Sequence, residues 1–269
     1  MPDSALSISP RDLGGRRLEI EAVSVSDLSR SELVRHLGQV IDRRGQVCLG
    51  FCNANMLLKA LTAPAYAAAL RKFLLVSDGL GIDLCSLLFR GRTFRENLNG
   101  TDLVPAFLAA ETRPRTLFLL GARPGIAEAA AHNLARRFPQ HRVVGTRDGY
   151  FTDDETAAVV GAINAASPDI LLVALGNPSQ ELFIAEQAHR IDARVLMGVG
   201  ALLDYTAGSS VRAPALLRLA RLEWLFRLLR EPQRLGRRYT LEAALFLVMI
   251  VRLRISALAR RRGPALTAP

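Results

Sequence analysis

The sequence predicts an α/β fold with a mostly parallel sheet and helices on both faces, followed by a C-terminal helical basic appendage. Short apolar runs alternate with longer helical patterns through most of the 269-residue chain, which is typical of a parallel sheet. The run at 170–175 is continuously apolar, as expected of a strand covered on both faces. The arginines gathered after residue 211 predict the appendage.

The elements follow in order after residues 1–26, which we expect to be flexible. Strands are expected at 47–51, 73–76, 116–120, 142–145, 170–175 and 195–199. Helices are expected at 27–44 and 55–71, in a stretch ending at 89, and at 102–111, 125–138, 153–166 and 178–191. The pattern predicts one Rossmann-like domain over 27–214.

The net charge of +10 lies in the last fifth of the chain. Thirteen arginines and three glutamates lie between Arg212 and Arg262, and the other acidic and basic residues balance. Within 215–269 we expect an apolar helical stripe ending at Leu229, then a second, Arg-flanked helix over about 239–259. A basic tail on a neutral body suggests membrane headgroups, phosphorylated ligands or nucleic acid as partner.

The sequence has no features of a secreted protein. Cys48, Cys52 and Cys85 form no metal-binding or disulfide pattern, which favours a reducing compartment. The N-terminal residues do not resemble a signal peptide. The apolar run 243–251 is far shorter than the roughly 20 residues that a membrane-spanning helix needs. We therefore expect a cytoplasmic protein.

Polar residues and glycines gather where the predicted strands end, and ligands of open α/β sheets bind there. The junctions are Cys52-Asn53, Asp78-Gly79, Gly121, Gly176-Asn177 and Gly198–Gly200.

Asp78 has two interpretations, a helix N-cap or a general base that deprotonates a sugar hydroxyl. Ordinary helix-start signals explain Asn177 and Pro178, whereas Gln180 could hydrogen-bond a ligand. Thr101 is expected to cap a helix, and the residues alone favour solvent exposure for Arg95.

Several chemistries lack their sequence signatures. The four histidines show no metal spacing, and no Asp-x-Asp pair is present to hold a metal-bound nucleotide sugar. Arginines and helix N-termini would then have to stabilise a diphosphate leaving group. Neither a P-loop nor a GxGxxG motif after a strand is found, so ATPase and dinucleotide-dependent oxidoreductase functions have no support. We expect no metal and no cofactor.

An ordered set of motifs between Val47 and Tyr239 resembles the WecG/TagA/CpsF glycosyltransferases. The motifs are CNAN (52–55), SDGLG (77–81), RENLNGTD (95–102), LLGARPG (119–125), DGYF (148–151), PDILLVALGNPSQE (168–181), GVGALLDYTAG (198–208), RAP (212–214) and LEWLFRLLREPQRLGRRY (222–239). The resemblance implies an inverting, metal-independent transferase that moves a sugar from a nucleotide diphosphate sugar, here expected to be UDP-linked, to a polyprenyl-diphosphate-linked acceptor in cell-surface or exopolysaccharide synthesis.

The resemblance also implies roles for individual residues. Asp78 matches the proposed catalytic base, and Gln180 and Asn53 match residues proposed to touch the sugar or the acceptor. Arg95 matches a substrate-binding arginine, and Gly121, Tyr150 and Asp204 match positions around the nucleoside. In the appendage, three arginines match residues thought to close over the site and stabilise the diphosphate: Arg227, Arg234 and Arg237. The appendage is also expected to bring the enzyme to the inner face of the plasma membrane.

Two departures and two rival functions remain. Phe51 occupies a position where the family often has Thr or Ser, and Ser179 replaces a usual Lys. The segment past Tyr239 suggests stronger membrane attachment than a minimal member has. The rivals are a non-catalytic membrane scaffold of the same fold and a nucleic-acid-binding protein with a basic tail. Neither the transferred sugar nor the oligomeric state can be derived from the sequence.

Overall fold

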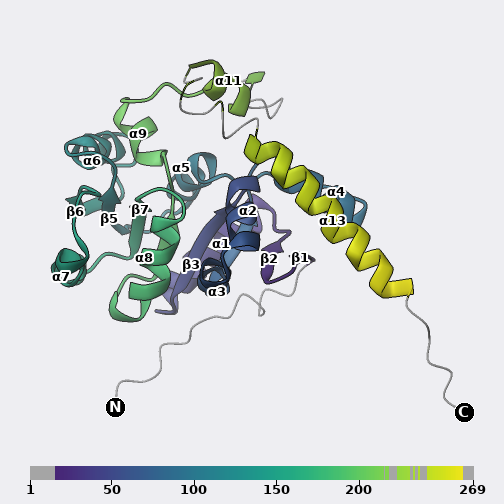
Figure 1. Ribbon diagram of the computed structural model, residues 1–269. Helices are drawn as coiled ribbons and strands as arrows, with labels where there is room; N and C mark the ends of the chain where they lie inside the picture. The colour runs from purple at the N-terminus through teal and green to yellow at the C-terminus, as the bar shows by residue number, and fades with distance from the viewer. Residues whose placement is uncertain are drawn as a thin grey trace, which may run out of the picture. The chain divides into compact units, whose positions relative to one another are not determined.

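The computed structural model describes residues 16–214, 216–217, 223–230, 233, 236 and 241–262 (Figure 1). The chain divides into two compact units, each formed by two segments of the sequence. Unit 1 comprises Met1–Asp78 and Phe94–Arg212, and unit 2 comprises Gly79–Thr93 and Ala213–Pro269. The segment 79–93 groups with the C-terminal part of the chain, which the sequence did not indicate.

Unit 1 is built on an eight-stranded sheet with the order β1-β2-β4-β3-β8-β7-β5-β6. All strands run parallel except β1, which pairs antiparallel with β2. The strands are β1 (Arg17–Ile20), β2 (Val23–Ser26), β3 (Val47–Cys52), β4 (Phe73–Ser77), β5 (Thr116–Gly121), β6 (Arg142–Arg147), β7 (Ile170–Ala174) and β8 (Val195–Gly198). The predicted α/β fold is therefore confirmed, and the six predicted strands are all present.

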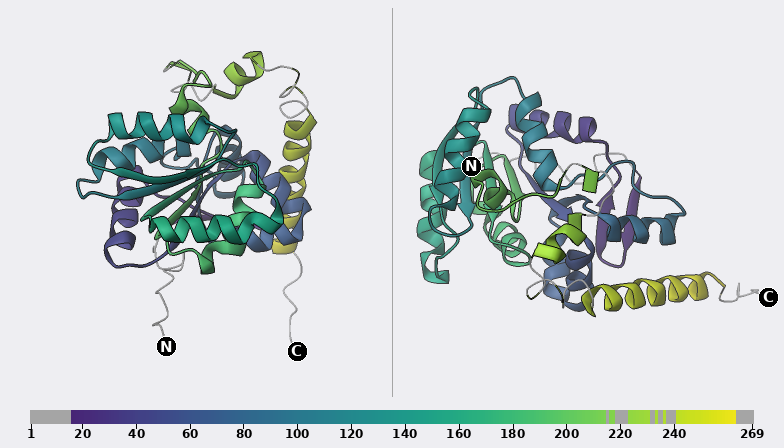
Figure 2. Two further views of the ribbon diagram at one scale, coloured as in Figure 1. Left: turned by 90° about the vertical axis from the view of Figure 1, so that its left-hand side faces the viewer. Right: turned by 90° about the horizontal axis from the view of Figure 1, so that it is seen from above.

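Helices cover both faces of this sheet (Figure 2). Alternate residues of the central strands point to opposite faces, so that Leu119 joins one core while Leu120 is buried on the other side. The first core is closed by α1 (Arg30–Asp42), α5 (Gly100–Ala110), α6 (Ile126–Arg137) and α9 (Leu202–Ala207). The second face is covered by α2 (Ala54–Thr62), α3 (Pro64–Leu70), α7 (Thr156–Ala166) and α8 (Ser179–Gln187).

Three predictions about local structure were wrong. The segment expected to be flexible up to residue 26 contains the β1–β2 hairpin, whose turn includes Glu21 at φ 49°. The helix expected over 55–71 is two helices, because Ala63 is extended and Pro64 starts the second one. The helix expected from 102 starts at Gly100, and Asn99 rather than Thr101 caps it through a bond from the Asp102 N–H to Asn99 Oδ1 (2.9 Å).

Unit 2 contains α4 (Leu80–Arg90), α11 (Glu223–Arg230) and α13 (Ala243–Arg262). Helix α13 packs on α4, with Phe246 and Ile250 buried and the Arg254 guanidinium 5.8 Å from the centre of the Phe89 ring. The opposite face of α13 stays exposed and apolar through Leu247, Val248, Val251, Ile255 and Leu258. Within the described residues, no helix combines the length and apolar character needed to cross a bilayer.

Candidate functional site

The parallel strands place most of the predicted site residues at one edge of the sheet. Asp78 follows β4 and Asn53 follows the neighbouring β3, where Cys52 pairs with Ser77. The Asp78 N–H donates to the Cys52 carbonyl at 2.8 Å, which fixes the two strand ends side by side. Strand β8 borders β3 on its other side, and β7, β5 and β6 follow in that order. The carboxyl ends of all six strands therefore form one rim.

Asp78 does not act as the helix cap that one interpretation allowed. Helix α4 starts at Leu80 with Gly79 as its N-cap, and no side chain caps this end. Gly79 has φ 90°, a conformation that glycine adopts without strain. Asp78 is half-buried, so its carboxylate can reach solvent at the rim. Asp78 is therefore not the N-cap of α4.

Asn53 is committed to its own helix through one end of its amide. Its Oδ1 accepts from the Met56 N–H at 3.0 Å, which makes Asn53 the N-cap of α2. Among the residues that the structure describes, Asn53 Nδ2 has no hydrogen-bond partner. What Asn53 can offer a ligand is therefore an N–H donor.

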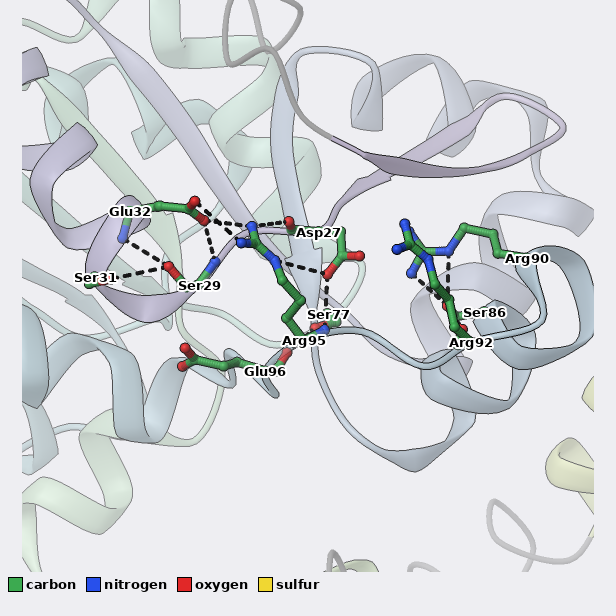
Figure 3. A network of polar contacts seen from close by, with 10 residues as sticks. All are labelled: Asp27, Ser29, Ser31, Glu32, Ser77, Ser86, Arg90, Arg92, Arg95 and Glu96. Atoms are coloured by element: carbon green, nitrogen blue, oxygen red, sulfur yellow. Dashed lines mark hydrogen bonds and ion pairs between the residues drawn. The ribbon is translucent and has the colours of Figure 1, made fainter.

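Arg95 belongs to a polar network with Asp27 and Glu32, here called the Arg95 clamp (Figure 3). Its Nη2 donates to Glu32 Oε2 and to the Asp27 carbonyl, both at 2.6 Å, and Nη1 donates to Glu32 Oε1 at 3.3 Å. Glu32 in turn accepts from the Ser29 N–H at 2.7 Å in the capping box of α1. That backbone hydrogen bond and the Arg95 guanidinium lower the pKa of Glu32 to about 2.

The clamp fixes the loop that carries Arg95 against the end of β4. The Arg95 N–H donates to Asp27 Oδ1 at 3.0 Å, and the Asp27 side chain is almost completely buried. Next to it, the Ser77 hydroxyl donates to the Glu96 carbonyl and the Leu98 N–H donates to the Ser77 carbonyl, both at 2.8 Å. Within the described residues, three of the five guanidinium N–H groups donate to protein, and Nε lies 3.8 Å from Asp27 Oδ1. Arg95 thus braces the strand end.

The ends of β5 and β6 lie together at the other side of the rim. Gly121 ends β5 with φ 125°, and an added Cβ there would lie 2.5 Å from the backbone of Ala174 on β7. The Gly149 N–H donates to the Ala122 carbonyl at 2.9 Å, which places the loop after β6 beside Gly121. Tyr150, in this loop, is 68% exposed. Only glycine fits at position 121 because the two backbones approach so closely.

Asp204 lies on α9, the helix that follows β8 and packs against α6. The Ser209 hydroxyl donates to the Asp204 carbonyl at 3.0 Å and lies 3.4 Å from its Oδ1. The carboxylate keeps acceptor positions for a ligand, since a carboxylate accepts about four hydrogen bonds. Helix α6 follows Gly121 along the chain, so Asp204 belongs to the same part of unit 1 as the β5 end.

Gln180 is held by protein partners at the start of α8. It is 5% exposed, its Oε1 accepts from the Gly200 N–H at 3.0 Å, and its Nε2 donates to Glu181 Oε1 at 2.7 Å. Asn177 is not the cap of α8, because that helix starts at Ser179 after Pro178. The Asn177 amide donates to Glu181 Oε2 instead, at 3.0 Å.

Three predicted site residues cannot be placed. Arg234 and Arg237 lie outside the described residues, and the side chain of Arg227 on α11 does as well. Across the described part of the chain, no group of three or more His, Cys, Asp and Glu side chains is arranged to hold a metal ion.

The acidic residues that support the site could not be recognised from the sequence. Asp27 and Glu32 are separated from Arg95 by 68 and 63 residues, so no local pattern connects them. Glu181 is completely buried, although glutamate is a residue type that is almost always exposed. The one available signal was the position of Glu181 directly after Gln180 in the matching motif NPSQE.

The chain is similar in sequence to characterised bacterial transferases. It is 30% identical over 223 residues to an N-acetylglucosaminyldiphosphoundecaprenol N-acetyl-beta-D-mannosaminyltransferase from Bacillus spizizenii, which covers 81% of this chain and 86% of the relative. Relatives of the same name from Bacillus subtilis and Staphylococcus aureus are each 31% identical, over 60% and 69% of this chain and 62% and 72% of their own lengths.

A family model matches nearly the whole described chain. The glycosyl transferase WecG/TagA/CpsF family matches residues 18–260, which include both units and every motif named above. The chain belongs to the WecG/TagA/CpsF family and is a glycosyltransferase.

Proposed function

We propose that this glycosyltransferase moves a sugar from a UDP-linked donor to a polyprenyl-diphosphate-linked saccharide, with inversion and without a metal ion, in cell-surface polysaccharide synthesis. The observation that carries the proposal is Asp78, a half-buried carboxylate that follows β4 and whose N–H is bonded to the Cys52 carbonyl, next in the chain to Asn53. The names of the relatives support a diphosphoundecaprenol-linked N-acetylglucosamine as the acceptor and N-acetylmannosamine as the sugar transferred.

In this mechanism Asp78 takes the proton of the acceptor hydroxyl as its oxygen attacks the anomeric carbon. The new glycosidic bond forms on one face while the bond to the diphosphate breaks on the other, which inverts the configuration. The nucleoside lies near Gly121, Tyr150 and Asp204. Asn53 donates a hydrogen bond to a sugar oxygen, and the remaining N–H groups of Arg95 face the substrate.

The departing diphosphate is anionic and has to be stabilised by positive charge. The sequence has no Asp-x-Asp pair to hold a metal ion for this purpose, so side chains would have to supply the charge. We assign this role to Arg227, Arg234 and Arg237, since guanidinium groups bind phosphate oxygens in pairs. Preorganised donors of this kind act on the charge that develops in the transition state.

A donor screen tests the proposed reaction. Purified protein is incubated with N-acetylglucosaminyl-diphosphoundecaprenol as acceptor and, in separate reactions, with UDP-linked N-acetylmannosamine, its uronic acid or glucose as donor. All reactions contain EDTA. We expect transfer from the N-acetylmannosamine donor. Transfer that requires added divalent metal would refute metal independence. Absence of transfer from every donor, together with absence of UDP binding by calorimetry, would refute the proposed function.

Asp78→Asn tests the base. We expect turnover to fall by about 10²- to 10⁴-fold because the proton acceptor is lost, while UDP affinity stays nearly unchanged. The matched control is Asp154→Asn, an exposed aspartate in the 3-10 turn before α7. Near-full activity of Asp78→Asn would remove Asp78 from this role.

We also propose that unit 2 attaches the enzyme to an anionic membrane surface. The exposed apolar face of α13 has Arg252 and Arg254 at its two borders. Each basic residue close to such a surface contributes on the order of 1 kcal/mol. In α4, which also belongs to unit 2, Leu80, Leu84 and Leu87 are exposed on one helical stripe.

Vesicle sedimentation tests the attachment. We expect the full chain to sediment with vesicles that contain anionic lipid, and the pair Val248→Glu and Ile255→Glu to reduce the bound fraction several-fold. Ala158→Glu, an exposed change on α7 of unit 1, is the control for added negative charge. Equal binding by the α13 variant and the control would refute this surface.

A further inference from the structure

A buried polar cluster lies behind the rim at the start of α8. It consists of Tyr66, Asn177, Gln180 and Glu181 and is here called the Glu181 cluster. Glu181 is 0% exposed, Tyr66 4% and Gln180 5%. Such a group of polar side chains is costly to bury unless their hydrogen bonds are made. The pattern of its bonds therefore indicates what the cluster is for.

Three neutral donors converge on the two oxygens of Glu181. Gln180 Nε2 donates to Oε1 at 2.7 Å, and Tyr66 Oη and Asn177 Nδ2 each donate to Oε2 at 3.0 Å. Burial raises the pKa of Glu181, and the hydrogen bonds from its neighbours oppose that shift. An ionised carboxylate suits this arrangement, because it only accepts hydrogen bonds and all three neighbours donate to it.

Asn177 shows how strongly the carboxylate orients its neighbours. Its Nδ2 donates to Glu181 and also to the Tyr66 hydroxyl. Its Oδ1 is buried and has no hydrogen-bond partner within the described residues. An amide leaves its oxygen unpaired in this way when its N–H groups are needed for the carboxylate.

The same carboxylate determines which way the Gln180 amide faces. With Nε2 at Glu181, the opposite atom Oε1 accepts from the Gly200 N–H at 3.0 Å. The reversed amide would set two acceptors against each other at Glu181 and two donors at Gly200. Gly198 leaves room for this amide, because an added Cβ would lie 2.9 Å from Gln180 Nε2. Within the described residues, the second N–H of Gln180 Nε2 has no hydrogen-bond partner.

We propose that Glu181 is a positioning residue, which holds the Gln180 amide so that it presents an N–H donor, and not an acceptor, to an oxygen of the bound sugar. The ligand class is thus a hydroxyl or acetamido oxygen. This inference rests on the proposed function for its ligand. The orientation itself is a property of the chain and can be measured without any reaction.

Hydrogen exchange of the Gly200 N–H, followed by NMR, reads the orientation directly. Glu181→Gln removes the charge, so the Gln180 amide can turn and release Gly200. We expect exchange at Gly200 to speed up by about tenfold or more, as the loss of one buried hydrogen bond allows. Glu186→Gln, an exposed change on α8, is the matched control, because it removes one carboxylate charge and leaves the contact of Gln180 with Glu181 Oε1. Unchanged exchange at Gly200 in Glu181→Gln would overturn the inference, whatever the enzyme's reaction.

A double-mutant cycle tests whether Glu181 acts through Gln180. We expect Gln180→Ala to lower kcat by about 10²-fold, and Glu181→Gln to lower it by about tenfold. The double variant should be no slower than Gln180→Ala, because the second change removes nothing that is left to position. Additive losses would show that Glu181 serves the reaction independently and would overturn the positioning role. If the wild-type chain transfers no sugar, the proposed function fails, and the exchange experiment alone decides the orientation.

Discussion

The Arg95 clamp holds the Arg95 loop and the Glu181 cluster holds the start of α8, and the two supports use opposite electrostatic means. In the clamp, a half-exposed guanidinium neutralises Glu32, whose pKa is lowered to about 2. In the cluster, Glu181 is buried among neutral donors, and burial raises its pKa. The difference indicates that charge pairing can fix a loop open to water, whereas hydrogen bonds fix the buried carboxylate at the start of α8.

The Arg95 loop and the start of α8 should differ in rigidity. Exposed ion pairs contribute about 1 kcal/mol or less, because water screens them, whereas hydrogen bonds to a buried charge contribute about 1.5–3 kcal/mol. The start of α8 should therefore be the more rigid of the two supports. The Arg95 loop should be the more adaptable one, which suits a residue proposed to contact substrate.

Tyr66→Phe should have the largest effect on stability. The change removes the Tyr66 hydroxyl from Glu181 Oε2 and from Asn177 Nδ2. We expect the free energy of unfolding to fall by about 1.5–3 kcal/mol, measured by urea unfolding at pH 7. Tyr150→Phe, at an exposed tyrosine, is the control and should change it by less than about 0.5 kcal/mol. Equal stabilities of the two variants would contradict the view that hydrogen bonds to Glu181 support α8.

The amino-acid sequence could predict the continuously apolar strands but not the short strands of mixed composition. Strands such as β7 were predicted to within a residue, because an unbroken apolar run has few alternatives in an α/β protein. The β1–β2 hairpin was missed because its strands have four residues each and mix charged, polar and apolar side chains. Periodicity over such short segments carries little information.

The candidate site followed a similar rule. Residues at strand ends, such as Asp78 and Gly121, could be found because strand order alone brings them to the rim. Their supports could not be found, since Tyr66 meets Glu181 across 115 positions and Arg95 meets Glu32 across 63. The bond from the Gly200 N–H to Gln180 could not be predicted either, because it depends on β8 lying next to β7.

Glu32→Gln should have a smaller effect, and its pH dependence should distinguish the clamp from the cluster. The folded pKa of Glu32 is about 2, below its ordinary value of 4.5. The contribution of Glu32 to stability is therefore complete above pH 4.5 and is lost as the pH falls toward 2. We expect Glu32→Gln to lower the free energy of unfolding by about 1 kcal/mol or less at pH 7, and the difference from wild type to shrink steadily between pH 4.5 and pH 2.

Glu181 should show the opposite sign, because its pKa is raised. Its ionisation costs stability as the pH rises through the folded pKa, so Glu181→Gln should gain stability relative to wild type with rising pH. Urea unfolding from pH 3 to pH 8 measures both variants, with Glu186→Gln, an exposed change on α8, as the control. If the two differences from wild type changed with pH in the same direction, Glu32 and Glu181 would not be held by opposite electrostatic means, and charge pairing could not be what fixes the Arg95 loop.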